Sequence, residues 1–342
     1  MKLRSILKKR FVEEYISVDT VGNDSIYAYG AVNKNEDILL NSSSGGVVYE
    51  LCHVILGEGG AVCASIYDYD LHELKHTLIE DVLEIEKTRG SKYFQSDISG
   101  VYKDIERFLK CNMGRKLLFI GTPCQCAAIK NYLKVKRIAI DNLFCVDIIC
   151  HGVGSNQIWN DFVKDIERKN NDKIVKITFK DKRRGWLLPY AVAYGSSGKE
   201  YDLCDYMTLY NKHLIMRDEC HACSFASIKR VGDITVGDFW NVQKVCKSFY
   251  NTNGVSCVLC NTEKGNSLFL SIREKIDTVS LSVMDCIQPN MQHPTPDNEL
   301  SDVFWNEYQS RGFTYVRKKY ASKIWIDRVI RHFLVKFGVW KV

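Results

Sequence analysis

The chain has 342 residues, of which 46% are hydrophobic and 26% are charged, and its formal net charge is +6. This composition is typical of a soluble globular protein with one large or two ordinary domains, and it excludes an intrinsically disordered chain. The uncharged apolar runs end well short of the ~20 residues that a membrane-spanning helix needs, and no secretory signal follows the basic N-terminal residues. We therefore expect a cytoplasmic protein.

The positive charge is concentrated at the C-terminus. Residues 317–342 contain eight lysines or arginines and a single acid, Asp327, so the rest of the chain is nearly neutral. A nucleic-acid-binding protein would carry basic residues on its folded body with exposed aromatic residues between them, so no nucleic-acid partner is predicted. From Ile324 to Trp340, hydrophobic residues recur at mostly helical spacing. Such a basic amphipathic helix either lies against an anionic membrane surface or docks on the protein's own body.

In the first half of the chain, predicted strands alternate with predicted helices. The hydrophobic pattern predicts strands over 25–33, 61–67, 116–121 and 144–150, and helices over 45–60, 100–114 and 124–134. Strands that are apolar throughout and alternate with helices indicate a parallel or mixed sheet with both faces covered.

After residue 170 the predicted strands are shorter and lie over 173–182, 187–195, 233–239 and 254–262. The expected fold class is therefore α/β with an α+β C-terminal half, in which helices flank a mixed sheet. The expected division has an N-terminal α/β half at 1–170, a C-terminal α+β half at 171–300 and a basic helical tail at 301–342.

Fourteen cysteines are more than packing alone requires, and a reducing cytoplasm disfavours a disulfide framework. Four of them lie where a strand ends or a turn begins. Cys124 starts a predicted helix, Cys150 ends an apolar strand, and Cys220 and Cys223 form a C-x-x-C pair. The positive end of the helix should lower the pKa of the Cys124 thiol.

Basic residues near the C-x-x-C pair, namely Arg217, Lys229 and Arg230, should offset the negative charge of its thiolates. Four thiolates are what a 4Fe-4S cluster or a structural zinc ion requires, and the count does not choose between them. A thiol-disulfide role is less favoured, because the pair does not open a helix directly after a strand.

The other ten cysteines are expected to pack as small hydrophobic residues. They are Cys52, Cys63, Cys111, Cys126, Cys145, Cys204, Cys246, Cys257, Cys260 and Cys286. Two of them form a second C-x-x-C pair, but the alternation of a strand should place Cys257 and Cys260 on opposite faces, where they cannot close on one metal.

A second candidate site precedes the predicted helix at 45–60. Ser43, Ser44, Gly45 and Gly46 bring hydroxyl groups and backbone amides to a positive helix end, which suits a phosphate or the polar edge of a flavin. The same residues also suit a plain N-cap with a tight turn. The stretch matches neither a Walker loop nor a G-x-G-x-x-G motif.

Further along, Arg89, Ser91, Lys92 and Tyr93 either hold a phosphate and a ring or form a solvated loop. No acid partner can be placed for His151, so no catalytic residue is predicted. Phe239 and Trp240 pack in a turn or lie beside a flavin.

Seven motifs in chain order resemble the family of the coenzyme F-420 hydrogenase/dehydrogenase beta subunit, in its bacterial branch. They are NSSSGGV, RGSKYFQSD, FIGTPCQ, DIICHGVGS, FKDKRRGW, RDECHACSF and DITVGDFW, and they run from about residue 26 to about residue 275. The resemblance implies an iron-sulfur flavoprotein oxidoreductase that passes electrons between a one-electron donor and a hydride acceptor. For this chain, the resemblance implies the 4Fe-4S ligands Cys124, Cys150, Cys220 and Cys223. The FAD surface would include Ser43, Ser44, Gly45, Gly46, Arg89, Ser91, Lys92 and Tyr93.

The resemblance also bears on partners. Many bacterial relatives begin with a ferredoxin-like segment, whereas this chain has no cysteine before Cys52, so the expected donor is a separate ferredoxin or another carrier protein. The acceptor would be a small molecule, and similar proteins imply a link to polysaccharide biosynthesis. The alternative is a non-catalytic, zinc-stabilised assembly or scaffolding protein for surface-polysaccharide synthesis that uses the same four cysteines.

Overall fold

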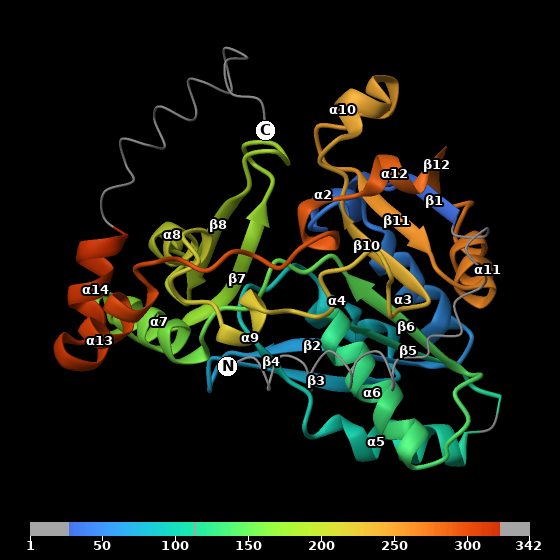
Figure 1. Cartoon of the computed structure of the whole chain (residues 1–342), viewed down its shortest axis with the longest axis horizontal. Coiled ribbons are helices and arrows are strands. Elements are labelled where there is room, and N and C mark those ends of the chain that lie inside the picture. Colours follow the sequence, from blue (N-terminus) through green and yellow to red (C-terminus); the bar gives the residue numbers. More distant parts are fainter. Residues whose placement is uncertain (1–26, 113, 322–342) are drawn as a thin grey trace.

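A mixed β-sheet of nine strands lies at the centre of the computed structural model, which describes residues 27–112 and 114–321 (Figure 1). The strand order is β12-β1-β11-β10-β6-β5-β2-β3-β4. The strands are β1 (Tyr27–Asn33), β2 (Ala61–Asp68), β3 (Glu73–Ile79), β4 (Ser96–Asp97), β5 (Leu117–Gly121), β6 (Leu143–Ile148), β10 (Ile234–Asp238), β11 (Ser256–Cys260) and β12 (Ile276–Leu281).

The strand directions decide where a site can form. β6 pairs in parallel with both β5 and β10, and β5 pairs in parallel with β2. β11 is antiparallel to both β10 and β1, so β1 runs in the same direction as β10. The carboxyl ends of β1, β2, β5, β6 and β10 therefore meet at one edge of the sheet, where open α/β sheets bind ligands.

Helices cover both faces of this sheet, as the apolar strands predict. On one face, α3 (Val47–Gly57) and α11 (Glu263–Ser271) pack on alternate strand residues such as Val62. On the other face, α5 (Val101–Cys111) and α6 (Pro123–Val135) pack on the intervening residues. Cys257 and Cys260 belong to different hydrophobic clusters, which confirms that they lie on opposite faces of β11.

A smaller antiparallel sheet follows, as the α+β prediction for the second half of the chain requires. It consists of β7 (Ile174–Asp181), β8 (Tyr190–Gly195) and β9 (Glu200–Asp202). Its core is rich in aromatic side chains, among them Trp159 and Tyr206. The helices around it are α7 (Asn156–Asn170), α8 (Cys204–Asn211), α13 (Ser301–Arg311) and α14 (Phe313–Tyr320). Short helices are α2 (Glu36–Leu40), α4 (Ile85–Thr88), α9 (Asp218–His221), α10 (Val242–Val245) and α12 (Val283–Cys286).

The predicted mixed sheet flanked by helices is confirmed, and the three-part division of the chain stays a prediction. The helix predicted from residue 45 begins at Val47, because Gly46 before it has a left-handed φ of 83°. The start of the basic tail docks on the body, where Arg317 of α14 bonds Asp165 and Asp205. Residues 322–342, which carry the amphipathic pattern, lie outside the described residues. No helix in the described part of the chain is long and apolar enough to cross a membrane.

Candidate functional site

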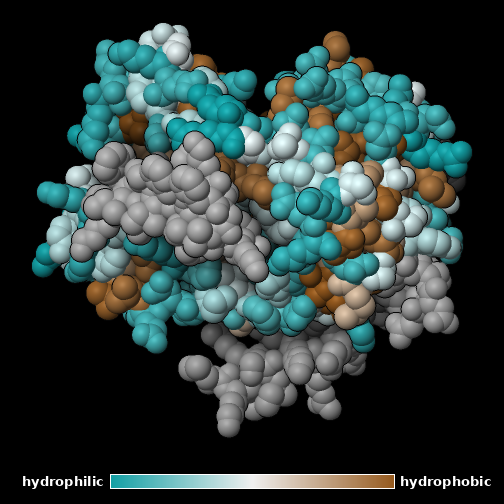
Figure 2. Space-filling view, turned by 90° about the horizontal axis from the view of Figure 1, so that it is seen from above, coloured by the Kyte–Doolittle hydropathy of each residue, from teal (hydrophilic) through white to brown (hydrophobic). Residues whose placement is uncertain are grey.

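A cavity of about 1000 Å³ lies at the carboxyl edge of the large sheet. Segments that follow β1, β5, β6 and β10 form one side of it, and β7, the segment before β8, and α8 form another. The cavity therefore lies between the two sheets of the molecule. Seen from above, the surface is notched between two parts, and hydrophobic residues lie in the notch (Figure 2).

All but one of the residues that the resemblance assigns to FAD line this cavity. They are Ser43, Ser44, Gly46, Arg89, Ser91, Lys92 and Tyr93. Gly45 lies just behind the wall, where a Cβ atom on it would stand 2.1 Å from the carbonyl oxygen of Ala31 and 2.6 Å from the backbone nitrogen of Ser256. Gly45 thus lets the serine loop pack directly on β1 and β11.

The serines fasten this loop instead of capping α3. The Ser43 hydroxyl accepts a hydrogen bond of 2.7 Å from the backbone of Ser91, and the Ser44 hydroxyl donates one of 2.8 Å to the carbonyl of Val255. No side chain caps the N-terminus of α3, whose first residues line the cavity. The positive end of an 11-residue helix therefore faces the cavity.

Two buried polar atoms in the cavity wall have no hydrogen-bond partner among the described residues. They are Nε of Arg89 and Oγ of Ser65. The guanidinium of Arg89 lies 4.7 Å from the ring centre of Tyr49, and its other nitrogens bond Glu86 and the carbonyl of Ile38. Because unpaired buried donors are costly, their presence in a cavity wall indicates a polar ligand.

Three lysines surround the same region. Burial lowers the pKa of Lys92 to about 8, and its ammonium group donates to the carbonyls of Ser65, Thr88 and Arg89. Burial also lowers the pKa of Lys182 to about 7.

The third, Lys180, pairs with Asp238, and these two side chains are about nine-tenths buried. Lys180 also lies 5.4 Å from the ring centre of Trp240, which stacks on Trp186 at 5.4 Å. Trp240 lines the cavity, whereas Phe239 is buried in the core. The sequence left open whether Phe239 and Trp240 pack in a turn or face a ligand. Phe239 packs in the core, and Trp240 faces the cavity.

The four cysteines of the predicted metal site come from three turns of the chain. Cys124 lies in the first turn of α6, just after the N-cap Thr122. Cys150 follows β6 and lines the cavity, and Cys220 and Cys223 lie in and just after α9. The backbone N–H of Gly152 donates to the sulfur of Cys150 at 3.4 Å. A Cβ atom on Gly152 would stand 3.3 Å from that of Cys220, so these two turns pack directly together.

The ionisation of these thiols shows that all four are neighbours. Burial, the largest cause, and the negative charges of Cys124, Cys220 and Cys223 together raise the pKa of Cys150 to about 12, although the hydrogen bond from the backbone of Gly152 lowers it. Burial and the negative charges of Cys124 and Cys223 also raise the pKa of Cys220, and the guanidinium of Arg217 counteracts this rise.

The pKa predicted for Cys124 is wrong in direction. Solvent reaches this residue, but the surrounding protein desolvates its sulfur, and this effect raises the pKa despite the hydrogen bond from Thr122. The helix start therefore lowers the pKa of Cys124 by less than desolvation raises it.

The spacing of the thiols bears on the kind of metal centre. Among residues 27–112 and 114–321, no three His, Cys, Asp or Glu side chains come close enough to hold a single metal ion. A zinc ion draws its four sulfurs to ~2.3 Å from one atom. A cubane cluster spaces the cysteine sulfurs around its own iron and sulfide atoms, so its ligands stand much further apart.

Of the basic residues predicted to offset the thiolates, Arg217 acts as expected on Cys220. Arg230 does not, because its guanidinium is buried against the carboxylate of Asp147 at 2.7 Å. The local sequence could not reveal this pair, since its partners lie 83 residues apart.

Most of the other ten cysteines pack as predicted, since seven of them are buried: Cys52, Cys63, Cys126, Cys145, Cys257, Cys260 and Cys286. The expectation fails for Cys111, which is exposed, for Cys204, which lines the cavity, and for Cys246, which is only partly buried. Ser65, Lys180 and Lys182 were not predicted as site residues from the sequence. For the two lysines the signal was their place in the FKDKRRGW motif, at the end of the strand predicted over 173–182.

Two models of one family match this chain. The C-terminal model of the beta subunit of coenzyme F420 hydrogenase/dehydrogenase matches residues 114–282, and its N-terminal model matches residues 28–103. The chain belongs to this family. The resemblance seen in the sequence is thus confirmed, and the chain is an oxidoreductase-type subunit.

A solved structure shows the same fold. The chain is similar to a chain of the F420-reducing NiFe hydrogenase complex from Methanosarcina barkeri, with 16% sequence identity and a TM-score of 0.51. The match covers 85% of this chain and 90% of the other. The fold shared with that chain therefore extends beyond the residues that the family models match.

Proposed function

We propose that this beta-subunit relative is an iron-sulfur flavoprotein oxidoreductase that binds FAD in the cavity and a 4Fe-4S cluster on Cys124, Cys150, Cys220 and Cys223. It would pass electrons between a one-electron donor and a hydride acceptor. The observation that carries the proposal is the contact between the two candidate sites, because Cys150 is both one of the four neighbouring thiols and a residue of the cavity wall.

Three features of the cavity support FAD. The uncapped N-terminus of α3 and the cationic side chains of Arg89 and Lys92 suit the pyrophosphate. The unpartnered Nε of Arg89 and Oγ of Ser65 suit ligand oxygens or ring nitrogens. The volume of about 1000 Å³ is at the upper end of the range for small-molecule sites, which accommodates a dinucleotide and leaves room for an acceptor.

The choice of a cluster over zinc rests on the thiols. The other three are close enough for their negative charges to raise the pKa of Cys150, yet no three of the described ligand side chains are spaced for one ion. Backbone N–H groups also point at the sulfurs, as from Gly152 to Cys150, and such hydrogen bonds are a means of setting a cluster's potential.

A flavin takes up two electrons as a hydride and releases them singly, whereas a cluster carries one at a time. The chain's own residues bring the two sites together at the ends of β5, β6 and β10. We further propose a ferredoxin or another carrier protein as the donor, a small-molecule acceptor, and peripheral membrane contact through the tail at 317–342. The link to polysaccharide biosynthesis and a cytoplasmic location stay predictions from the sequence.

Cofactor content tests the proposal directly. We expect anaerobically purified protein to be yellow-brown, with flavin bands and a broad iron-sulfur shoulder near ~400 nm. Cys223→Ala should lose most of its iron and keep its flavin, because Cys223 does not line the cavity. The matched control is Cys111→Ala, at the exposed end of α5, which should keep both. A colourless protein with one zinc per chain would instead establish the scaffolding alternative.

A further inference from the structure

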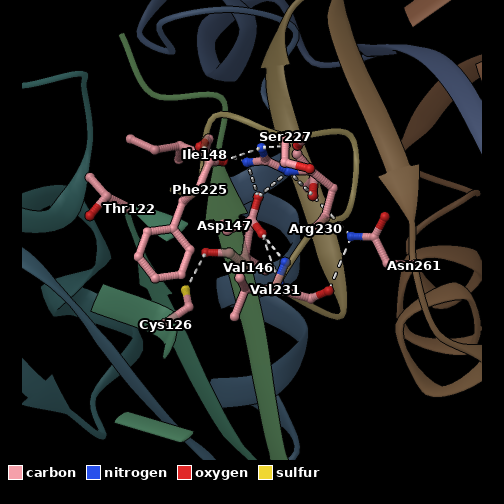
Figure 3. A network of polar contacts seen from close by, with 12 residues as sticks. Thr122, Cys126, Val146, Asp147, Ile148, Phe225, Ser227, Arg230, Val231 and Asn261 are labelled. Atoms are coloured by element: carbon pink, nitrogen blue, oxygen red, sulfur yellow. Dashed lines mark hydrogen bonds and ion pairs between the residues drawn. The ribbon is translucent and has the colours of Figure 1, made fainter. Parts of the chain in front are cut away.

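A buried ion pair joins β6 to the segment that follows the C-x-x-C pair (Figure 3). The side chain of Asp147 is fully buried and that of Arg230 is 2% exposed. One carboxylate oxygen of Asp147 accepts from Nε and Nη2 of Arg230, at 3.2 and 2.7 Å. The other oxygen accepts from the backbone N–H groups of Val231 and Gly232, at 3.1 and 2.7 Å. The carboxylate therefore fixes residues 230–232 on β6.

The rest of the guanidinium reaches two cysteine-bearing segments. Nη2 donates to the carbonyl of Ile148, two residues before Cys150, at 3.4 Å. Nη1 donates to the carbonyls of Phe225 and Ser227, at 3.4 and 3.1 Å. Phe225 lies two residues after Cys223. One side chain thus bonds the backbone of Ile148 and that of Phe225 and Ser227 (Figure 3), and so reaches the segments of both cysteines.

Stability alone does not explain such a pair. Moving two charges out of water costs several kcal/mol for each ion, and well-packed hydrophobic residues of similar volume are often at least as stabilising. What a hydrophobic pair cannot do is hold several carbonyls in fixed directions. A lysine could not do so either, because its single ammonium lacks the planar array of five donors.

We propose that Arg230 is a positioning residue that holds the loop of Cys223 against the end of β6, at the distance from Cys150 that the metal centre needs. The inference rests on the proposed function in so far as these cysteines bind a cluster. The contacts that carry it belong to the protein itself and can be measured without metal.

The effect should be specific to Cys223. Cys220 has its own support, because its backbone N–H bonds the carbonyl of Arg217 and its side chain packs on Gly152. Cys124 is held in the first turn of α6. Arg230 also binds the carbonyl of Ile148 near Cys150, but that stretch is held by the sheet as well, because the N–H of Ile149 donates to the carbonyl of Val236 at 2.8 Å. Of the four thiols, Cys223 therefore depends most on Arg230, which binds the carbonyls just after it.

The first test is the alkylation of each thiol by iodoacetamide in metal-free, full-length protein, followed by mass spectrometry. Arg230→Lys keeps a positive charge beside Asp147 but removes the carbonyl contacts. Because the loop loses hydrogen bonds from a charged group, alkylation of Cys223 should become at least about tenfold faster, while Cys124 reacts at the wild-type rate.

Arg317→Lys is the matched control, because Arg317 is also an arginine paired with carboxylates, those of Asp165 and Asp205, but it contacts α7 and α8 instead of the cysteine segments. It should leave Cys223 unchanged. An unchanged Cys223 rate in Arg230→Lys overturns the proposal. A uniform rise at every thiol also overturns it, since that result shows loss of the fold and not release of one loop.

The second test uses anaerobically reconstituted protein. Arg230→Lys should bind less iron per chain than the wild type and give a changed electron paramagnetic resonance spectrum, while its flavin content stays the same. Wild-type iron content and an unchanged spectrum would contradict positioning. If the wild type itself binds no iron, the proposed function fails, whereas the alkylation result for Cys223 still supports or overturns the role of Arg230 in holding the loop.

Discussion

Gly45 packs so closely against two strands that a side chain has no room. Its missing Cβ would meet backbone atoms of Ala31 and Ser256, which cannot rotate away as a flexible side chain could. Gly45→Ala should therefore displace the serine loop and lower the free energy of unfolding by about 1–3 kcal/mol or more. FAD should also bind more weakly, because the loop carries Ser43 and Ser44. Urea unfolding and FAD titration measure the two effects.

A second glycine beside the same helix provides the control for this prediction. A Cβ atom on Gly57, at the end of α3, would meet nothing outside its own helix within 4 Å, and the φ of this residue is not positive. Gly57→Ala should leave FAD binding unchanged and keep or raise stability, because alanine loses less backbone entropy in a helix. Equal effects of the two substitutions would contradict the role of Gly45.

The charge of Lys92 predicts how FAD binding depends on pH. Burial lowers its pKa to about 8, so the ammonium form predominates below that pH and the neutral amine above it. An anionic ligand binds the ammonium form better, so the affinity for FAD should fall as the pH rises through 8. A lost charged contact of about 1.5 kcal/mol corresponds to a loss of about tenfold. Fluorescence titrations between pH 6.5 and 9.5 measure this dependence.

Replacing the lysine should remove that dependence. Lys92→Met should bind FAD weakly at every pH, without the decrease near pH 8. Lys103→Met, on the exposed face of α5, should behave like the wild type. If the affinity of Lys92→Met for FAD still decreases near pH 8, another group in the cavity wall causes the pH dependence.

At the scale of elements, the sequence analysis found several strongly patterned segments but not all of them, since α7, with Ile158, Trp159 and Phe162 at helical spacing, was not predicted. β5 and β6 are apolar throughout and were recognised, as was α6, whose start is marked by Thr122 and Pro123. β3 and β12 have polar, partly exposed faces and were missed. Their strand character comes from pairing with β2 and β1, which is tertiary information.

Basic residues at the start of the tail form ion pairs within the protein. Arg317 and Lys319 pair with Asp165, Asp205 and Glu307, so their charges are partly neutralised. Binding to anionic vesicles should therefore depend on residues 322–342. Deleting them should abolish co-sedimentation with vesicles containing phosphatidylserine. Vesicles of phosphatidylcholine alone provide the control.

A substitution of Arg317, in the part of the tail that docks on the body, separates stabilisation of the fold from vesicle binding. Arg317→Ala should keep vesicle binding but lower the free energy of unfolding by about 1–2 kcal/mol, because Asp165 is 5% exposed and loses a charged partner. Vesicle binding that survives the deletion of 322–342 would rule out the tail as the membrane contact.

At the scale of the whole molecule, the sequence indicated the site residues but not their geometry. The cysteines stood out by their places at strand ends, and parallel strands bring such ends to one edge. The sequence could not show that β1 enters between β11 and β12 and so carries the serine loop to that edge. It also could not show that the β7–β8 sheet closes the other side of the cavity.

This arrangement predicts that FAD stabilises the molecule as a whole. Because both sheets contribute to the cavity wall, a ligand bound there contacts both parts of the molecule. FAD at a hundred times its Kd should stabilise the folded state by about 2.7 kcal/mol. For a chain of this length, the melting temperature should rise by about 4 °C. Riboflavin at the same concentration lacks the phosphates that Arg89 and the start of α3 would bind, so its shift should be smaller. Equal shifts in melting temperature for both ligands would show that Arg89 and the start of α3 do not bind the phosphates. Arg89→Met should reduce the shift with FAD to that with riboflavin.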